Sequence, residues 1–377
     1  MSSTFKEKKN SDGLHNNDLF FIIDGPYSQI FCKFANKNQS SLLMDTFVQC
    51  VGNNRIVLEN KNSLDCYGRW PAPTVIFVDG PYGINGFPGD PKDTKLLPEV
   101  YAPHIAEWSK HAKPDTTLWF WGTELGWACM HHYLEVNGWD YEQTFIWNKG
   151  IGHVAGNVNS KTIRQAPVVT EVCVRYTKRV TIESIDGKQQ SLQEWLHSEW
   201  KRTGLPFSKT NEACGVKNAA TRKYFTLDDM WYFPPSNAMK MIADYANKYG
   251  DPFGRPFFTV GGKQMSETLW ESMRAKWNHI HGYTNVWSLP ALHSKERLKD
   301  GKSHKSLHYN QNPVSIIDYI IRTSSDEGDV VWDPFAGLAT TAWCCRRLGR
   351  SCYCAEITES TFRNAVSRLS ETDLFAV

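Results

Sequence analysis

The sequence of 377 residues has no long hydrophobic run. Its longest apolar stretches, such as Phe20 to Ile23, are far shorter than the roughly 20 residues that a membrane-spanning helix needs. No secretory signal is expected, because the segment from Met1 to Asn17 is polar and charged. These absences predict a cytoplasmic protein without a membrane segment.

A strong net charge is missing as well. The 42 Lys and Arg residues nearly balance the 40 Asp and Glu residues, which leaves a formal net charge of +2. A protein that attracts polyanions over its whole surface would be strongly basic. Any surface that binds a nucleic acid must therefore be local.

The ten cysteines lack the Cys-x-x-Cys pairs from which structural zinc sites usually draw their ligands. Irregular spacing also argues against a disulfide framework, so a reducing compartment is expected. Four cysteines come close together in the sequence, on segments that are typical of a helix and a buried strand: Cys344, Cys345, Cys352 and Cys354. We expect these side chains to pack in a core, and we expect no metal site.

Short apolar runs bounded by Gly, Pro, Asn or Asp predict buried strands. The first four lie at residues 74–78, 117–121, 143–147 and 169–174, with helical spacing between them at 99–111 and 125–137. The alternation resumes near the end of the chain, with helices at 313–324, 340–348 and 359–369 and strands at 329–332 and 351–355. This order predicts an α/β fold, with a mostly parallel sheet and helices on both faces.

The alternation is interrupted by a charged, Trp-rich and weakly periodic stretch. We interpret this stretch, residues 179–305, as an insertion that divides one catalytic fold. The predicted parts are a flexible arm (1–17), a first half (18–178), the insertion (179–305) and a second half (306–377).

The segment from Gly328 to Thr341 is typical of a strand, a tight turn and the start of a helix, and a second strand ends at Glu356. The backbone at Gly337 can approach a ligand closely, and an acid at the end of the second strand can accept hydrogen bonds from ribose hydroxyls. The three glycines of a dinucleotide fingerprint are missing, which argues against a pyrophosphate site. Taken alone, the segment also fits a purely structural turn.

Several motifs in a fixed order resemble those of the amino-directed DNA methyltransferases, and together they cover roughly half of the chain. They are Asp79 to Tyr82, Leu118 to Gly122, Gly138-Trp139, Ile146 to Lys149, Glu171 to Tyr176, His308 to Val314, Asp333 to Gly337 and Arg350 to Glu356. The order of the motifs resembles that of the circularly permuted subgroup, in which the catalytic motif precedes the cofactor motif. The resemblance implies a Rossmann-like sheet, S-adenosylmethionine as cofactor, double-stranded DNA as partner and a cognate restriction endonuclease as a candidate partner. Oligomeric state stays open.

The resemblance assigns a cofactor site to residues from both halves of the fold: Asn62, Ser63, His308, Gln311, Asn312, Pro313, Asp333, Phe335, Gly337, Thr341 and Glu356. Two departures from the family pattern concern this site. Ala339 stands where the family usually has Gly, and alanine is small enough to preserve the loop. Asn312 stands where a Lys is common, which removes a positive charge that could face the cofactor carboxylate.

The tetrapeptide Asp79-Gly80-Pro81-Tyr82 follows the predicted strand 74–78, at the edge where ligands bind in open α/β sheets. An exocyclic base amine is a poor nucleophile because its lone pair is delocalised, so acceptors must draw it into line with the methyl donor. The carboxylate of Asp79 and the carbonyl of Gly80 supply such acceptors. Pro81 stiffens the loop, and Tyr82 offers a face for a flipped base. The family usually has Pro at the second position, so Gly80 is expected to leave the loop more flexible.

The same four residues also occur at Asp24 to Tyr27. Only the later copy is preceded by Asn62-Ser63-Leu64, which resembles the adenine-side motif of the family with Asn in place of its usual Asp. Only the later copy is followed by Gly83-Ile84-Asn85. We interpret the earlier copy as a turn.

Within the insertion, residues 207–214, 215–216 and 218–225 resemble a helix, a turn and a basic second helix. A helix-turn-helix of this kind would place Lys217, Arg222 and Lys223 near DNA. A solvated helical hairpin is the alternative.

The predicted activity is methylation of adenine N6, because cytosine N4 enzymes more often carry Ser in place of Asp79. Methylation of cytosine N4 remains an alternative, as does a noncatalytic DNA-binding subunit of a modification complex. The presence of Asp79, Tyr82 and Glu356 argues against the noncatalytic alternative. Methylation at carbon 5 is not expected, because it needs a nucleophilic Cys, typically after Pro, and the sequence has no Pro-Cys pair.

Overall fold

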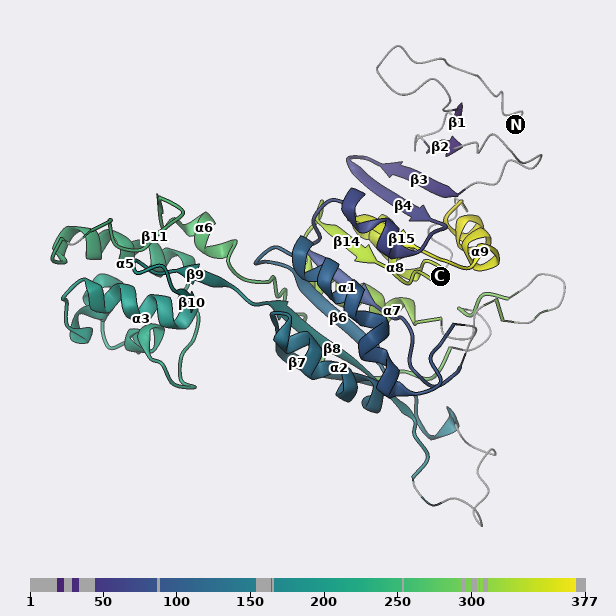
Figure 1. Ribbon diagram of the computed structural model, residues 1–377, viewed down its shortest axis with the longest axis horizontal. Helices are drawn as coiled ribbons and strands as arrows, with labels where there is room; N and C mark the ends of the chain where they lie inside the picture. The colour runs from purple at the N-terminus through teal and green to yellow at the C-terminus, as the bar shows by residue number, and fades with distance from the viewer. Residues whose placement is uncertain are drawn as a thin grey trace. The chain divides into compact units, whose positions relative to one another are not determined.

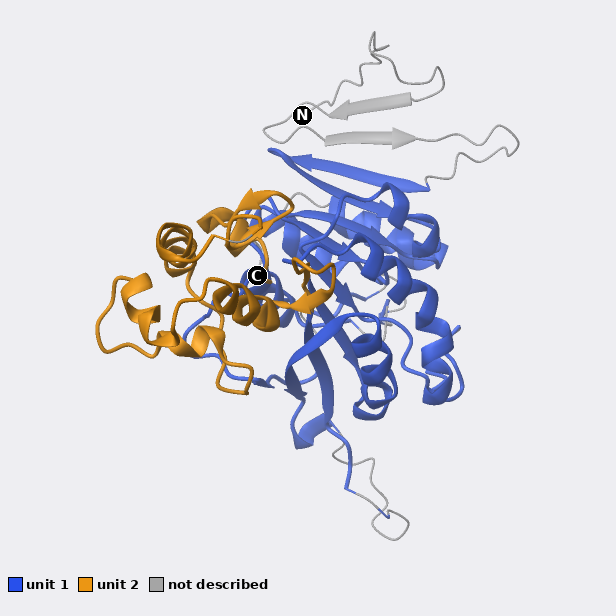
Figure 2. Ribbon diagram, turned by 60° about the vertical axis from the view of Figure 1, so that its left-hand side comes forward, with its two compact units in different colours: residues 1–177, 276–377 blue, residues 178–275 orange. Residues whose placement is uncertain are grey.

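The computed structural model describes residues 19–23, 29–33, 45–86, 89–153, 164, 166–252, 254–292, 296–299, 304, 306–307 and 311–370. The chain forms two compact units, unit 1 (residues 1–177 and 276–377) and unit 2 (residues 178–275), which Figure 2 colours separately. The predicted arm 1–17 and the tetrapeptide at Asp24 lie outside the described residues.

Unit 1 contains a nine-stranded sheet in the order β13-β7-β8-β6-β5-β14-β15-β4-β3 among the residues that are described (Figure 1). Its strands are β3 (Thr46–Val51), β4 (Asn54–Glu59), β5 (Val75–Val78), β6 (Thr117–Gly122), β7 (Trp139–Asn148), β8 (Thr170–Lys178), β13 (Val286–Ser288), β14 (Val330–Asp333) and β15 (Ser351–Ala355). The central pairs β6·β5, β5·β14, β14·β15 and β15·β4 are parallel, whereas β8 runs antiparallel to β6 and β3 runs antiparallel to β4. A separate antiparallel pair consists of β1 (Leu19–Ile23) and β2 (Gln29–Lys33).

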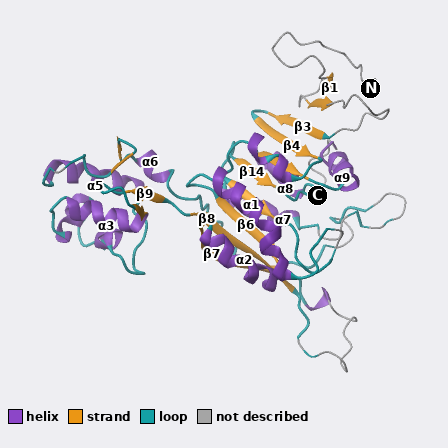
Figure 3. Cartoon of the chain, in the orientation of Figure 1, coloured by secondary structure: helices purple, strands orange, loops and turns teal. Residues whose placement is uncertain are grey.

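Helices cover both faces of this sheet, and Figure 3 shows α1 and α2 together over one of them. The side chains of α1 (Leu97–His111) and α2 (Glu124–Val136) share one core cluster with alternate residues of the strands, and those of α7 (Val314–Ser324), α8 (Thr340–Leu348) and α9 (Glu359–Ser370) share the other. Strand β5 illustrates the alternation, because Val75 and Phe77 belong to one cluster and Ile76 and Val78 to the other. The predicted α/β fold is therefore confirmed. Short 3-10 helices complete unit 1: η1 (Ser63–Asp65), η2 (Tyr67–Arg69), η3 (Thr94–Leu96) and η4 (Ile151–His153).

The four clustered cysteines lie on α8 and β15 and are fully buried in the core, as expected. Within the described residues, no group of three or more His, Cys, Asp or Glu side chains is arranged to hold a metal ion. In the same part of the chain, no helix has both the length and the apolar character that a membrane crossing requires.

Strands β5 and β14 are neighbours although roughly 250 residues of sequence separate them. Val75 pairs with Val331, and Ile76 pairs with Trp332. Because the two strands are parallel, the residues that follow them emerge at the same edge of the sheet. This pairing brings the tetrapeptide after β5 next to the loop after β14.

The predicted end of the insertion at residue 305 is wrong. Unit 2 ends at Ala275, and the next residues return to unit 1, where β13 extends the large sheet by pairing in parallel with β7. Trp287 of β13 is buried and stacks on Phe145 with ring centroids 5.0 Å apart. A strand of three residues has too little periodicity to be recognised in the sequence, so only its packing reveals it.

Unit 2 consists mainly of helices around its own core. Its elements are β9 (Thr181–Glu183), β10 (Gln189–Ser191), α3 (Leu192–Arg202), η5 (Phe207–Lys209), α4 (Thr210–Ala213), η6 (Thr221–Phe225), α5 (Ser236–Tyr249), β11 (Thr259–Val260), β12 (Lys263–Gln264) and α6 (Glu267–Glu271). Helix α3 begins at a capping box, in which Ser191 and Glu194 satisfy each other's backbone N–H groups.

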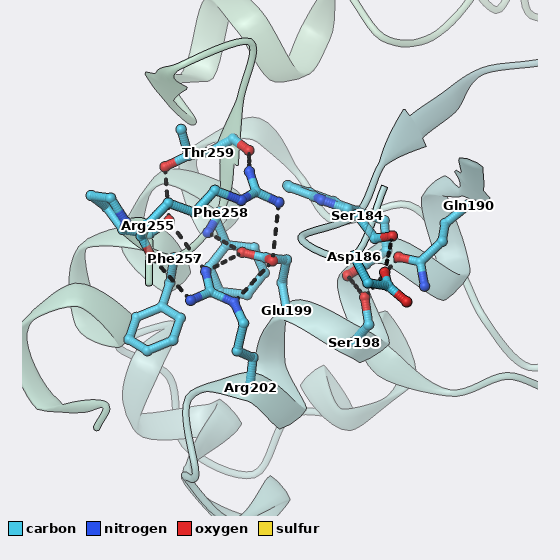
Figure 4. A network of polar contacts seen from close by, with 12 residues as sticks. Ser184, Asp186, Gln190, Ser198, Glu199, Arg202, Arg255, Phe257, Phe258 and Thr259 are labelled. Atoms are coloured by element: carbon cyan, nitrogen blue, oxygen red, sulfur yellow. Dashed lines mark hydrogen bonds and ion pairs between the residues drawn. The ribbon is translucent and has the colours of Figure 1, made fainter. Parts of the chain in front are cut away.

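A buried carboxylate ties α3 to a distant loop of unit 2 (Figure 4). Glu199 is 2% exposed and accepts hydrogen bonds from Arg202 at 2.8 Å and from the backbone N–H of Phe258 at 2.7 Å. Arg255 approaches the other carboxylate oxygen at 3.4 Å. Two cations and a backbone donor compensate the buried charge. The network therefore holds α3 and the loop around Phe258 together.

The helix-turn-helix prediction is wrong. The first segment is a 3-10 turn followed by the four-residue α4, and the second, η6, is a 3-10 helix of five residues. Asn218, between them, has a left-handed backbone with φ of 54°, which stops a helix from starting there. A 3-10 segment of this length cannot act as a recognition helix in a major groove.

Candidate active site

The carboxylate of Asp79, directly after β5, is held by side chains from two distant parts of the chain. One oxygen accepts a hydrogen bond from the Tyr82 hydroxyl at 2.7 Å, and the other accepts one from the Asn312 amide at 2.8 Å. Asn312 is buried and stands just before helix α7. The amide that replaces the family's Lys therefore points toward Asp79.

Burial raises the pKa of Asp79 to about 7, against the hydrogen bonds from Tyr82 and Asn312, which lower it. The negative charges of Glu171 and Asp333 raise the pKa of Asp79 further. Glu171, at the start of β8, forms an ion pair with Lys149. The carboxyl group of Asp79 consequently titrates near neutral pH.

Close packing explains Gly80, the departure from the family's tetrapeptide. A Cβ atom at this position would lie 2.5 Å from the Tyr101 hydroxyl oxygen and 2.9 Å from the Phe335 ring. The same hydroxyl donates a hydrogen bond to the carbonyl of Pro81 at 3.0 Å. Glycine is needed here because two aromatic side chains occupy the space that a larger residue would use.

The loop after the tetrapeptide is organised around Asp90, a residue that the sequence analysis missed. Its carboxylate is buried and accepts hydrogen bonds from the backbone N–H groups of Tyr82, Gly83, Ile84 and Gly86. Tyr82 is 6% exposed, so its ring is packed in the protein while its hydroxyl holds Asp79. In the sequence, Asp90 is recognisable only as an acidic residue that follows a segment rich in Gly and Pro.

The loop after β14 meets the end of β15. The backbone N–H of Gly337 donates to one oxygen of Glu356 at 3.0 Å, and the N–H of Thr358 donates to the other at 2.7 Å. Asn60 holds this end of β15 by donating to the carbonyl of Glu356 at 2.8 Å. Each carboxylate oxygen of Glu356 keeps a further lone pair, which suits the hydroxyls of a ribose.

Asp333, at the end of β14, is almost fully buried, and burial raises its pKa to about 7. Its carboxylate accepts a hydrogen bond from the N–H of Phe335 at 3.2 Å, and Thr341 provides a second, side-chain hydrogen bond. These contacts bring three of the residues in the predicted cofactor loop together. Burial also raises the pKa of Glu356.

Ala339 adopts a left-handed backbone, with φ of 55° and ψ of 40°, directly before helix α8. A side chain in this conformation costs roughly 1–2 kcal/mol, whereas glycine adopts it freely. The methyl group of Ala339 is completely buried. The loop therefore accommodates alanine, as expected. The backbone gives the reason why glycine is usual at this position.

The remaining predicted cofactor residues have mainly local contacts. Asn62 caps η1 by accepting from the N–H of Leu64, and Ser63 is buried beside the Tyr67 hydroxyl. Gln311 binds the backbone of a neighbouring loop at Glu296 and Leu298. Pro313 stands at the N-cap position of α7, and His308 lies outside the described residues.

A family model with the description DNA methylase, of the N6/N4 type, matches residues 74–367. This span includes both the tetrapeptide after β5 and the loop after β14. The chain belongs to the N6/N4 DNA methylase family.

Two curated relatives resemble this chain over shorter segments. The type II methyltransferase M.HinfI of Haemophilus influenzae is 39% identical over 87 residues, which are 23% of this chain and 24% of that protein. The type II methyltransferase M1.MboII of Moraxella bovis is 39% identical over 66 residues, 18% of this chain and 25% of that protein. The matches thus span about a quarter of each relative. Among solved structures, the M1.HpyAVI–SAM complex has a TM-score of 0.44 and 16% identity, over 83% of this chain and 98% of that one.

Three basic residues of unit 2 were predicted to lie near DNA. Lys217 and Arg222 are exposed and Lys223 is partly buried, on the loop before η6 and on η6 itself. None of the three forms an ion pair with another described residue of the chain. By comparison, Lys240 on α5 is paired with Asp244 at 2.7 Å.

Proposed function

We propose that this protein transfers a methyl group from S-adenosylmethionine to N6 of adenine in double-stranded DNA. The observation that carries the proposal is the carboxylate of Asp79, held by Tyr82 and Asn312 beside the loop that follows β14. The parallel pairing of β5 with β14 supports the proposal, because it brings the tetrapeptide after β5 and the loop after β14 to one edge of the sheet. The tetrapeptide precedes the loop after β14 in the sequence, and this order supports the circularly permuted arrangement.

The donor set after β14 and β15 fits the cofactor. Glu356 would accept the ribose hydroxyls, and the backbone at Gly337 would border the nucleoside. Phe335 lies in the same loop, with its ring against Tyr101 and His104. When bound, S-adenosylmethionine supplies an electrophilic methyl group on a positively charged sulfur.

The residues of the tetrapeptide then act on the target amine. Ionised Asp79 accepts a hydrogen bond from the amine, and the carbonyl of Gly80 accepts a second, which directs the nitrogen lone pair at the methyl group. After transfer the amine must lose a proton, and the carboxylate of Asp79, with a pKa of about 7, is suited to hold it. The choice of adenine rests on the carboxylate at this position. The alternatives are cytosine N4 and a noncatalytic DNA-binding subunit.

Unit 2 is the proposed target-recognition part, because its core is separate from the catalytic sheet. Lys217, Arg222 and Lys223 are proposed to contact DNA as a surface loop, without a recognition helix. Cations that lack an acidic partner on the protein are available for phosphates.

The deciding experiment is expression in a host without DNA methylation, followed by sequencing that distinguishes N6-methyladenine from N4-methylcytosine. We expect N6-methyladenine at one recognition sequence, and none with Asp79→Ala. Calorimetry with S-adenosylmethionine should show that this variant still binds the cofactor. N4-methylcytosine would replace the proposed base, and the absence of both cofactor binding and methylation would favour the noncatalytic alternative. A cognate endonuclease, if present as a partner, would cut at the same sequence.

A further inference from the structure

The backbone that follows Asp79 converges on a single buried acid. Asp90 is 6% exposed. One of its oxygens accepts from the N–H groups of Tyr82 and Gly83, both at 2.8 Å. The other accepts from the N–H groups of Ile84 at 3.1 Å and Gly86 at 2.9 Å. Four backbone N–H groups of the loop thus bind one side chain.

The charge of Asp90 is compensated by backbone N–H groups and not by a cationic side chain of the described residues. No Lys, Arg or His of the described residues forms an ion pair with it. A carboxylate offers about four lone-pair sites, and here each can be used by one backbone N–H. Because a buried carboxylate without partners would be strongly unfavourable, the loop and Asp90 stabilise each other.

Other contacts fix the same loop from outside. Gly83 has a φ of 72°, and a Cβ atom there would lie 2.6 Å from the Cα of Thr94, so the loop packs directly on η3. At the start of the loop, Tyr101 donates to the carbonyl of Pro81. Tyr82 connects these contacts to Asp79, because its N–H is bound by Asp90 and its hydroxyl is bound by Asp79.

We propose that Asp90 is a positioning residue for methyl transfer, which holds the backbone from Tyr82 to Gly86 so that Tyr82 orients Asp79 toward the target amine. The inference deepens the proposed function and rests on it. In the proposed arrangement, Asp90 contacts neither the base nor the cofactor. Its effect passes through the backbone of Tyr82 to the carboxylate of Asp79.

The test is Asp90→Asn, which keeps the size of the side chain but replaces one acceptor oxygen by an NH₂ group. Two of the four backbone donors then face a donor. We expect kcat to fall about 100-fold, as for a misplaced catalytic group. The KM for S-adenosylmethionine and the Kd for DNA should stay within about threefold, since the variant leaves the groups that touch both ligands in place.

Hydrogen exchange supplies a measurement that does not depend on activity. In the wild-type protein the amides of Tyr82, Gly83, Ile84 and Gly86 should be protected, and Asp90→Asn should accelerate their exchange while other segments keep their rates. Asp93→Asn is the matched control. Asp93 is exposed and, among the described residues, its side chain accepts only from the N–H of Lys95, so its replacement should change neither kcat nor exchange in the loop.

Gly83→Ala is a second perturbation that keeps Asp90, and it should reproduce the loss of kcat because it displaces the loop from η3. A kcat of Asp90→Asn within about threefold of wild type, or unchanged loop exchange, would overturn the proposal. So would a parallel loss of cofactor affinity and thermal stability, which indicates a general structural role. If the wild-type protein methylates no DNA, the proposed function fails by itself, while the exchange measurement still decides whether Asp90 holds the loop.

Discussion

The hydroxyl of Tyr101 occupies the place where a side chain at Gly80 would begin. A Cβ atom on Gly80 would lie 2.5 Å from that oxygen, well inside van der Waals contact. Since Tyr101 also binds the carbonyl of Pro81, the tetrapeptide and helix α1 are fitted to each other. Substitutions at this contact are therefore expected to have effects that the family pattern alone would not suggest.

Gly80→Ala should destabilise the protein by about 1–3 kcal/mol, because it overpacks a site bounded by Tyr101 and Phe335. Urea unfolding measures the change. Gly68→Ala is the control, since a Cβ atom at Gly68 would meet nothing within 4 Å, and it should alter stability by less than about 0.5 kcal/mol. Adding Tyr101→Phe should recover part of the loss, and equal effects of the two glycine variants would contradict this explanation.

Asn312 should influence the pH dependence of methylation. Asn312→Lys puts a positive charge beside Asp79 and favours its ionised form, so the pKa of Asp79 should fall below about 7. Asn312→Ala removes a hydrogen bond that lowers this pKa, so the pKa should rise. If activity needs ionised Asp79, the acidic limb of the kcat profile moves to lower pH in the first variant and to higher pH in the second. Shifts in the same direction would exclude this relationship.

Ala339→Gly should leave stability within about 1 kcal/mol of wild type. Relief of the left-handed conformation, worth roughly 1–2 kcal/mol, offsets the lost burial of one methyl group, worth about 0.8 kcal/mol. Ala342, equally buried but inside helix α8, is the matched control. Ala342→Gly should cost about 2 kcal/mol, because burial and helix propensity are both lost. Denaturant unfolding of the pair tests the difference, and a similar loss in both would count against the strain at residue 339.

Replacing Lys217, Arg222 or Lys223 by Ala should weaken DNA binding to all sequences alike. Each lost phosphate contact should reduce the slope of log K against log salt by about 1. Lys240→Ala serves as control, because that ammonium is already paired with Asp244. Binding isotherms at several salt concentrations supply the slopes. An unchanged slope in all three variants would remove these residues from the proposed DNA surface.

The sequence by itself determined the parts of this protein that depend on local pattern. Apolar runs and helical spacing marked most of the strands and helices of unit 1, because their periodicity reflects which face is buried. The tetrapeptide after β5 and the acid after β15 were recognisable for the same reason, since each immediately follows a strand. The position of a residue directly after a strand is fixed by the position of that strand.

Only the tertiary structure decided the contacts that join distant segments. The hydrogen bond from Asn312 to Asp79 spans 233 positions, and the fit of Gly80 against Tyr101 depends on how α1 packs, so neither follows from local spacing. The same holds for β13, whose three residues became a strand only through their partner in the sheet. In unit 2, the left-handed Asn218 replaced an expected recognition helix by a short turn. Periodicity specifies which face of an element is buried, whereas packing specifies what that face meets.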